Sequence, residues 1–179
     1  MIGGPPRCGK SELARRLTEA NAISFVPTDL LWAVLEGALP AWRPPMAKGP
    51  GRIDSAARMF EPYLERAVKL LAHWRKPFGI EGEVILPETA AKLRSTHDLR
   101  VVFLIRRTAT AAALLDPRGP HPWLQGAPPE LVTSVTAEVV SWSNQVQPVC
   151  ERLQIPCFDV GDDFDLALES AAEALGANG

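Results

Sequence analysis

This sequence lacks paired cysteines, long hydrophobic runs and an excess of basic charge. Its 179 residues include three cysteines, Cys8, Cys150 and Cys157, an odd number without CxxC spacing, which excludes a disulfide framework. No run approaches the ~18 apolar residues of a membrane-spanning helix, and no basic segment followed by an apolar stretch opens the chain. We therefore expect a reduced, cytoplasmic protein without a membrane partner.

The charge balance excludes further classes of partner. Lys and Arg number 19 against 21 Asp and Glu, for a net charge of −2, so no positive field attracts nucleic acid. The histidines His73, His97 and His121 lie far apart and lack ligand spacing such as i, i+4, so we expect no zinc site. Small-molecule partners remain, and a monomer and a homodimer are both open.

The chain does contain enough apolar material for one core. Hydrophobic residues make up 46 % and charged residues 22 % of the sequence, and a chain of this length supports one compact core. We expect residues 1–179 to form a single domain, in which any second unit is an insertion.

A phosphate-binding motif stands at the start, in "MIGGPPRCGKSELARRL". Gly4, Gly9, Lys10 and Ser11 fit the P-loop pattern G-x-x-x-x-G-K-[ST], in which backbone N–H groups cradle phosphates, the lysine reaches the β- and γ-phosphates and the hydroxyl binds Mg²⁺. The pattern predicts a nucleotide site with ATP and Mg²⁺ as cofactors.

The residues around the motif support this prediction. Leu13 and Leu17 lie at i, i+4, typical of the helix whose N-terminal dipole completes an anion site. We include Cys8 and Glu12 among the nucleotide-binding residues, with Cys8 as a small filler, because a lone loop cysteine gives no reason to propose catalysis. The alternative is a glycine-rich turn before an ordinary helix.

The segment before the motif is unusually short. Only Met1 and Ile2 precede the glycines, whereas a strand usually takes about 5–6 residues. Either the first strand is a stub or the native chain starts upstream of Met1. We expect the second, and N-terminal sequencing of the native protein tests it.

Apolar stretches of strand length alternate with helical patterns, the order expected of a parallel sheet covered by helices. We expect strands at residues 22–29, near Glu81, at 99–107 and at 155–160. Residues 38–52 are rich in Pro and Gly and predict a long loop. An amphipathic pattern covers 55–74, where Pro62 should begin a new helix or kink this one. The last helix has Asp162 or Asp163 as its N-cap and Gly176 as its stop.

This order resembles the small P-loop phosphotransferases, a group that includes nucleoside monophosphate, shikimate and gluconate kinases and the chloramphenicol phosphotransferases. The layout covers nearly the whole chain, but only Gly4 to Ser11 is a specific motif. The resemblance implies an α/β, three-layer P-loop NTPase fold with a mostly parallel sheet, an acceptor-binding helical insertion at 38–75 and a lid at 106–126. "VPTDLLWAVLEG" looks most like the chloramphenicol phosphotransferase segment whose Asp serves as the base, which implies Asp29 in that role.

Carboxylates at strand ends provide the remaining chemistry of phosphoryl transfer. Asp29 can accept the proton of an acceptor hydroxyl, or cap the following helix, or do both. No strand ends in Asp at the Walker B position, where Glu81 is the nearest acid. Glu81 could hold a metal-bound water or a substrate hydroxyl, although Glu83 and Glu88 compete for this task and a solvated turn is the alternative.

Arginines and tryptophans complete the candidate site. The lid resemblance implies that Arg107 or Arg118 closes over ATP; the alternative is two surface arginines and a loop. Trp32 and Trp42 either enclose an apolar acceptor or pack in the core.

The sequence therefore predicts an ATP-dependent phosphotransferase that acts on a hydroxyl of a small molecule, a metabolite or an antibiotic. A nucleoside monophosphate kinase is a subordinate alternative, because residues 38–52 supply only Arg43, Lys48 and Arg52 as cations for a phosphorylated acceptor. A nucleotide-binding regulatory protein without turnover is the other. A GTPase is not expected, since no N-K-x-D-like segment is present.

Overall fold

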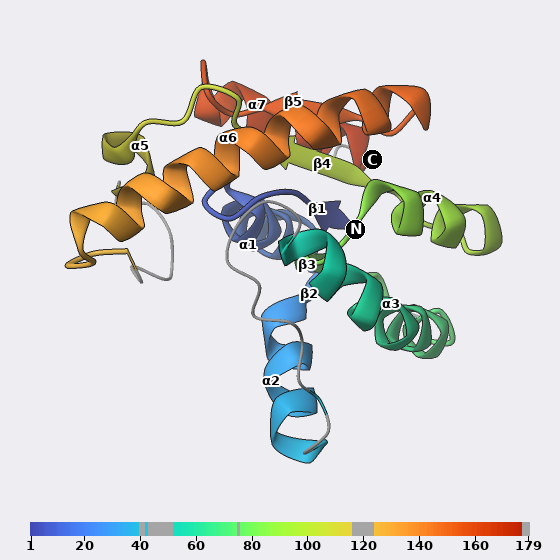
Figure 1. Cartoon of the computed structure of the whole chain (residues 1–179). Coiled ribbons are helices and arrows are strands. Elements are labelled where there is room, and N and C mark those ends of the chain that lie inside the picture. The colour runs from blue at the N-terminus through green and yellow to red at the C-terminus, as the bar shows by residue number, and fades with distance from the viewer. Residues whose placement is uncertain (40–41, 43–51, 75, 116–123, 177–179) are drawn as a thin grey trace.

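The computed structural model of the chain describes residues 1–39, 42, 52–74, 76–115 and 124–176 (Figure 1). Its strands are β1 (Ile2–Gly3), β2 (Ser24–Pro27), β3 (Phe78–Gly82), β4 (Val102–Ile105) and β5 (Cys157–Asp159). Its helices are α1 (Lys10–Asn21), α2 (Thr28–Ala38), α3 (Arg52–Leu71), α4 (Pro87–Thr96), α5 (Ala111–Leu115), α6 (Pro129–Arg152) and α7 (Phe164–Ala174). The strands form one parallel sheet in the order β2-β3-β1-β4-β5.

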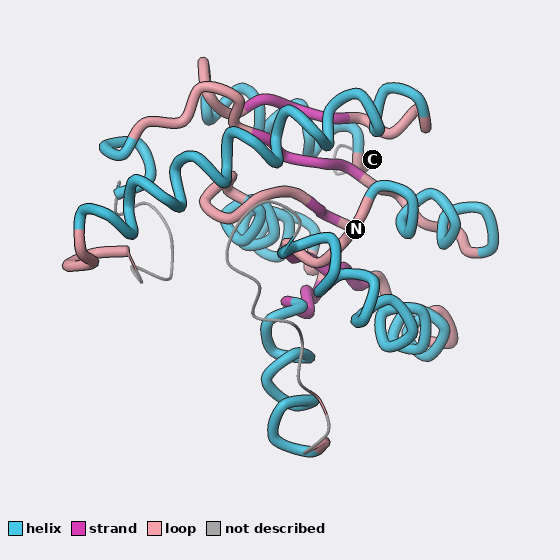
Figure 2. Tube along the Cα trace, in the orientation of Figure 1, coloured by secondary structure: helices cyan, strands magenta, loops and turns pink. Residues whose placement is uncertain are grey.

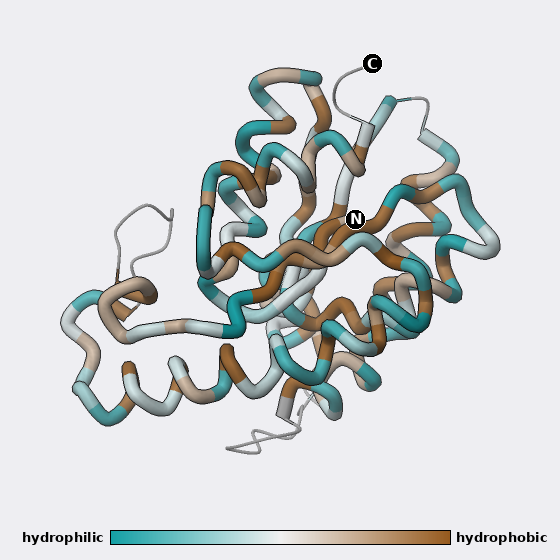
Figure 3. Tube along the Cα trace, turned by 90° about the horizontal axis from the view of Figure 1, so that it is seen from above, coloured by the Kyte–Doolittle hydropathy of each residue, from teal (hydrophilic) through white to brown (hydrophobic). Residues whose placement is uncertain are grey.

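Helices cover both faces of the sheet, which gives three layers (Figure 2). Successive residues of a strand point to opposite faces, and β4 follows this rule. Val102 and Leu104 belong to the core beneath α1 and α7, whereas Phe103 and Ile105 belong to the core beneath α3 and α4. Figure 3 shows the hydrophobic stretches gathered along the central strands. The expected three-layer α/β fold is confirmed.

The central strand is the shortest. β1 pairs on both sides, with Ile2 opposite Glu81 of β3 and opposite Val102 of β4. The chain leaves the sheet at Gly4, whose φ is 136° and whose added Cβ would lie 2.0 Å from the Leu104 carbonyl oxygen. Only glycine fits that close approach, so the two residues of β1 bring the phosphate-binding motif directly to the carboxyl edge of the sheet.

The strands are shorter than the sequence predicts. The predicted strand at 22–29 is paired only over Ser24–Pro27. Asp29 lies in the first turn of α2, because the apolar residues that follow it favour a helix and this helix begins at Thr28. The predicted strand at 99–107 is confined to Val102–Ile105, and that at 155–160 to Cys157–Asp159. An apolar stretch of sequence can be longer than the part of it that pairs in the sheet, because backbone hydrogen bonds form only where a neighbouring strand runs alongside.

The proline inside the long amphipathic segment does not divide it. α3 runs through Pro62 as one helix, so the expectation that a new helix begins there is wrong. Phe60, Leu64 and Val68 lie four residues apart and are buried, and their burial opposes the cost of about 3 kcal/mol that an interior proline imposes. Most of the predicted loop at 38–52 lies outside the described residues.

The end of the chain matches its predicted caps. The carboxylate of Asp163 accepts a hydrogen bond from the backbone N–H of Leu166 at 3.0 Å, which makes it the N-cap of α7. Gly176 follows the helix with φ 75°, as expected of a glycine that stops a helix. Among the helices of the described segments, none is long and apolar enough to cross a membrane.

Candidate nucleotide and acceptor site

The loop from 4 to 9 and the start of α1 form an anion-binding cradle. Gly9 is the N-cap of α1 with φ 85° and makes no side-chain cap bond, so the first amides of the helix keep their N–H groups for another acceptor. A Cβ on Gly9 would lie 2.8 Å from the ring of Phe164, which ties the loop to α7. Free amides at a helix N-terminus bind phosphate without further help.

Lys10 lies inside this cradle. It is 8 % exposed, and its Nζ donates a hydrogen bond to the carbonyl oxygen of Pro5 at 2.7 Å. A buried ammonium requires acceptor oxygens around it, and the loop carbonyl supplies one at the place where the motif predicts phosphate oxygens. The position of Lys10 therefore fits its predicted role.

The side chains of the two remaining candidates, Cys8 and Glu12, are buried or paired within the protein itself. Cys8 is fully buried, and burial raises the pKa of its thiol to about 12, against the opposing effects of Lys10 and Arg106. The thiol stays neutral, as expected of a filler. The carboxylate of Glu12 accepts hydrogen bonds from Arg15 and Arg16, which lower its pKa; its side chain is committed to these arginines.

Ser11 and Glu81 meet beside the cradle. The hydroxyl of Ser11 donates a hydrogen bond to Oε1 of Glu81 at 3.0 Å, and Glu81 is 7 % exposed. The pairing of Ile2 with Glu81 places this carboxylate on the strand next to β1. Mg²⁺ in phosphoryl-transfer sites takes one or two protein oxygen ligands together with substrate phosphates and water, and this oxygen pair fits that requirement.

The competing acids lie elsewhere. Glu88 is in the first turn of α4, where its carboxylate lies 3.6 Å from the guanidinium of Arg152. Glu83 follows β3 by one residue and is half-buried. The side chain of Glu81 is hydrogen-bonded to Ser11, whereas the carboxylate of Glu88 faces Arg152. This contact favours Glu81 over Glu88 as the acid beside the cradle.

Asp29 lies at the same edge of the sheet as Glu81. Pro27 pairs with Glu81 in the β2–β3 ladder, and Thr28 packs so closely over Gly82 that an added Cβ would lie 1.7 Å from its hydroxyl oxygen. Asp29 follows in the first turn of α2 and is exposed. The N-cap alternative is wrong, because Pro27 occupies that position and no side chain caps the helix.

The two arginines after β4 differ in their environment. Arg107 is half exposed, and its Nε donates to Oδ2 of Asp159 at 2.7 Å. Arg106 is 7 % exposed; its Nη1 donates to the carbonyl oxygen of Ala113 at 3.2 Å, while its Nε is buried without a hydrogen-bond partner in the described structure. Arg118 lies outside the described residues. The sequence prediction names Arg107, whereas the buried arginine after β4 is Arg106.

The predicted tryptophans pack against each other. The rings of Trp32 and Trp42 meet edge to face at 5.2 Å, and Trp42 meets Tyr63 at 5.0 Å. Trp32 also stacks on Phe60 at 6.0 Å. This cluster belongs to the hydrophobic core, which favours the packing alternative over the acceptor pocket for these two side chains.

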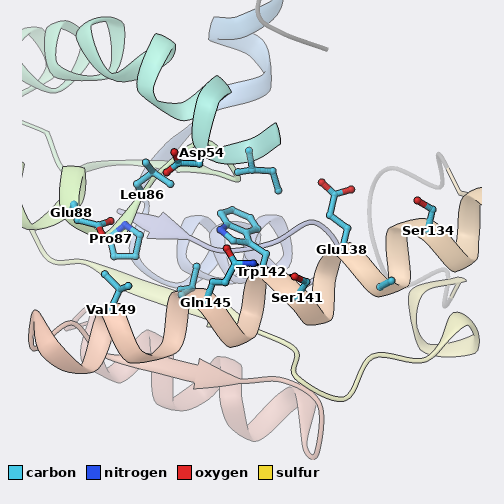
Figure 4. Close-up of a pocket in the computed structure, with 13 residues that line it drawn as sticks. Asp54, Leu86, Pro87, Glu88, Ser134, Glu138, Ser141, Trp142, Gln145 and Val149 are labelled. Carbon is cyan, nitrogen blue, oxygen red and sulfur yellow. Dashed lines mark hydrogen bonds between the residues drawn. The ribbon is translucent and has the colours of Figure 1, made fainter. Parts of the chain in front are cut away.

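A cavity of about 460 Å³ lies between α3, α4 and α6 (Figure 4). Leu86 and Glu88 line it from the segment that follows β3, and Trp142 lines it from α6. The hydroxyl of Ser143 accepts a hydrogen bond from the backbone N–H of Arg106 at 2.9 Å, which fixes this part of α6 at the end of β4. The described walls of the cavity come from the start of α3, from the segment around Leu86 and from α6.

Comparison with known proteins identifies the fold. No family model matches the chain, and no curated protein matches its sequence. Among solved structures, a shikimate kinase from Acinetobacter baumannii is similar with a TM-score of 0.58 and 15 % identity, over 98 % of this chain and 91 % of that one. A sugar kinase from Janibacter sp. has a TM-score of 0.54 and 12 % identity, over 98 % and 92 %.

A gluconokinase from Sinorhizobium meliloti is similar with a TM-score of 0.52 and 17 % identity, over 98 % of this chain and 88 % of that one. The class is thus defined: the chain has the α/β fold of the small P-loop kinases. The likeness lies in structure, since the identities are low. The fold that the sequence resemblance implies is confirmed, while the roles of the individual residues depend on the geometry described above.

Proposed function

We propose that the protein is an ATP-dependent phosphotransferase that moves the γ-phosphoryl group to a hydroxyl of a small molecule. The observation that carries this proposal is the hydrogen bond between Ser11 and Glu81 at 3.0 Å, beside a cradle that already contains Lys10. A phosphate cradle alone serves many purposes. A cradle with an adjacent pair of metal-ligating oxygens is what phosphoryl transfer requires.

The chain's own groups bind and orient the phosphates. The amides of the first turn of α1 hold phosphate oxygens, and Lys10 exchanges the Pro5 carbonyl for a phosphate oxygen. Ser11 and Glu81 would hold Mg²⁺, which would supply charge neutralisation on the phosphates. Arg106 adds a second buried cation, placed to stabilise charge that develops on the transferred group.

Asp29 is the proposed base. The oxygen of the acceptor hydroxyl forms a bond to the γ-phosphorus while the bond from that phosphorus to the β–γ bridging oxygen breaks, and ADP leaves with the bond's electron pair. The hydroxyl proton passes to the carboxylate of Asp29, which is exposed at the sheet edge and open to an acceptor. We further propose the segment 38–75 as the acceptor-binding insertion and 106–126 as a lid, in which Arg118 and Arg107 close over ATP.

The test follows phosphorylated product from radiolabelled ATP in a panel of hydroxylated acceptors, with Lys10→Ala and Asp29→Asn. Asp98→Asn is the matched control, because Asp98 is exposed beyond α4 at the far end of β4 from the cradle. We expect both site variants to lose product by about 100-fold or more, within the range for a lost catalytic proton acceptor, and the control to keep it.

Binding measured in parallel separates the alternatives. Asp29→Asn should retain ATP binding, because its side chain serves the acceptor. A protein that binds ATP and yields no phosphorylated product with any acceptor would contradict the proposal and favour a regulatory nucleotide-binding protein. If nucleoside monophosphates give the most product, the acceptor group is a phosphate and not a hydroxyl, and the protein is a nucleoside monophosphate kinase.

A further inference from the structure

The end of the short helix α5 accepts hydrogen bonds from two arginines that come from different parts of the chain. Nη1 of Arg106, which follows β4, donates to the carbonyl oxygen of Ala113 at 3.2 Å. Nε of Arg7, in the loop of the cradle, donates to the carbonyl oxygen of Leu114 at 2.9 Å. These carbonyls belong to the last turn of α5, where backbone oxygens have no partner within the helix. The two arginines therefore join α5 to the cradle loop and to the end of β4.

α5 is held at its start and along its buried side. The hydroxyl oxygen of Thr110 accepts a hydrogen bond from the backbone N–H of Ala113 at 3.2 Å, and the Thr110 carbonyl accepts one from the N–H of Leu114 at 3.1 Å. The side chain of Leu114 is fully buried in the core that also contains Cys8, and α5 packs beside α6 (Figure 1). The two adjacent carbonyls therefore keep a fixed position relative to each other.

Arg7 has an uncommon backbone conformation. Its φ is 60°, in the left-handed region that residues other than glycine seldom adopt. Such conformations persist where the surrounding structure holds them, and they occur often at ligand-binding sites. In this loop the hydrogen bond from Arg7 to the Leu114 carbonyl is one such contact. The cradle loop and α5 thus support each other through this side chain.

The guanidinium of Arg106 has a donor available for a ligand. Arg106 is 7 % exposed, and its Nε is buried without a hydrogen-bond partner in the part of the chain that the structure describes. Burial raises the pKa of the Cys8 thiol to about 12, and the charges of Lys10 and Arg106 oppose this rise, so Arg106 lies close to the cradle loop. A buried cation with an unused donor beside an anion cradle points to a phosphate oxygen.

We propose that Arg7 is a positioning residue for Arg106. Arg7 holds the end of α5 on the cradle loop, and the neighbouring carbonyl of Ala113 keeps the Arg106 guanidinium turned so that its Nε meets a phosphate oxygen of the bound nucleotide. This inference rests on the nucleotide binding in the proposed function and is independent of phosphoryl transfer. The alternative is that both arginines only satisfy the last carbonyls of α5.

A double-mutant cycle on nucleotide affinity tests this coupling. Arg7→Met, Arg106→Met and the double variant are compared with the wild-type protein by calorimetry of a non-hydrolysable ATP analogue with Mg²⁺. We expect Arg7→Met to raise the Kd about tenfold, because a charge-assisted hydrogen bond to phosphate loses its alignment. In the Arg106→Met background the same change should raise the Kd less than about twofold, since residues that act through one contact are not additive.

The matched control is an arginine that serves the end of another helix. Arg94 donates to the carbonyl oxygens of Leu153 and Gln154 after α6, at 3.0 and 3.1 Å, and is half-buried like Arg7. These carbonyls precede β5 and lie at the amino edge of the sheet, opposite to the cradle. Arg94→Met should leave the Kd of the analogue unchanged, whatever it does to the free energy of unfolding.

A second variant disturbs α5 without changing either arginine. Thr110→Val keeps the shape of the side chain and removes the acceptor of the Ala113 N–H, which loosens the start of the helix. It should raise the Kd about threefold in the wild-type background and leave it unchanged in the Arg106→Met background. Amide hydrogen exchange of Ala111–Leu115 should be faster in Arg7→Met and Thr110→Val, and unchanged in Arg94→Met.

The outcomes separate this inference from the proposed function. Equal effects of Arg7→Met with and without Arg106→Met would mean that Arg7 acts independently of Arg106 and would overturn the inference. An unchanged Kd in both Arg7→Met and Thr110→Val, with faster exchange in α5, would leave the arginines a structural role only. Analogue binding with the expected coupling, but no phosphorylated product from any acceptor, supports the positioning role and contradicts the kinase. A wild-type protein that does not bind the analogue overturns both.

Discussion

Replacing Arg106 with Met tests whether this buried arginine binds the phosphates of the nucleotide or only stabilises the fold. Arg106 is a buried charge that donates one described hydrogen bond, from Nη1 to the Ala113 carbonyl, while its buried Nε has no partner in the described structure. A buried, partly satisfied cation destabilises a fold unless an anion meets it. If phosphate is that anion, the guanidinium gains its partner only when nucleotide is bound.

The expected magnitudes follow from this environment. Loss of a charge-assisted hydrogen bond to phosphate costs about 1.5–3 kcal/mol, or roughly 10- to 150-fold in affinity. In the nucleotide-free protein, Arg106→Met removes one hydrogen bond, which lowers the free energy of unfolding. It also removes a buried charge, which raises that free energy. We expect the free energy of unfolding of the nucleotide-free protein to fall by less than about 1 kcal/mol or to rise.

The assay combines calorimetry of a non-hydrolysable ATP analogue with Mg²⁺ and denaturant unfolding of the nucleotide-free protein. Arg100→Met is the matched control, because Arg100 is exposed near the other end of β4 and donates to the carbonyl oxygen of Leu175. It should change nucleotide affinity by less than about threefold, because this side chain lies away from the cradle. Unchanged analogue affinity in Arg106→Met, together with a loss of several kcal/mol in unfolding free energy, would show that Arg106 stabilises the fold and does not bind nucleotide.

Three further predictions concern the cradle and its surroundings. Glu81→Gln should raise the Mg²⁺ concentration for half-maximal activity at least about tenfold, and an unchanged Mg²⁺ titration would exclude Glu81 as a ligand. Trp42→Ala should lower unfolding free energy by about 3–5 kcal/mol and affect the KM of acceptor and ATP equally; a selective rise in acceptor KM would restore its predicted pocket role. Because burial raises the Cys8 pKa from 9.0 to about 12, unfolding free energy should fall as pH rises between these values, when only the unfolded thiol has lost its proton. Alkaline unfolding curves should show this fall reduced in Cys8→Ala, and identical pH dependence would contradict it.

The cradle could be predicted because its chemistry is local. Gly4, Gly9, Lys10 and Ser11 are fixed by one loop, and the close approach of Gly4 to Leu104 explains why glycine stands there. The layered fold followed from the apolar run of β4, which is buried on both faces. The ends of the strands were predicted less well, because an apolar stretch does not show how many of its residues pair with a neighbouring strand.

Long-range pairings could not be read from the sequence. Ser11 and Glu81 are 70 positions apart in the sequence, and the pairing of β1 with β3 brings them close in space. The sequence alone left Glu83 and Glu88 as competitors of Glu81. Arg106 and Arg107 differ only in which way each side chain points from the end of β4.

Mass spectrometry of a panel of hydroxylated acceptors after incubation with MgATP tests the proposed phosphoryl transfer. We expect one small-molecule acceptor to gain one phosphoryl group in an amount equal to the ADP formed, and Lys10→Ala to abolish both. ADP formed without any phosphorylated acceptor, or ATP bound without ADP formation across the whole panel, would contradict it.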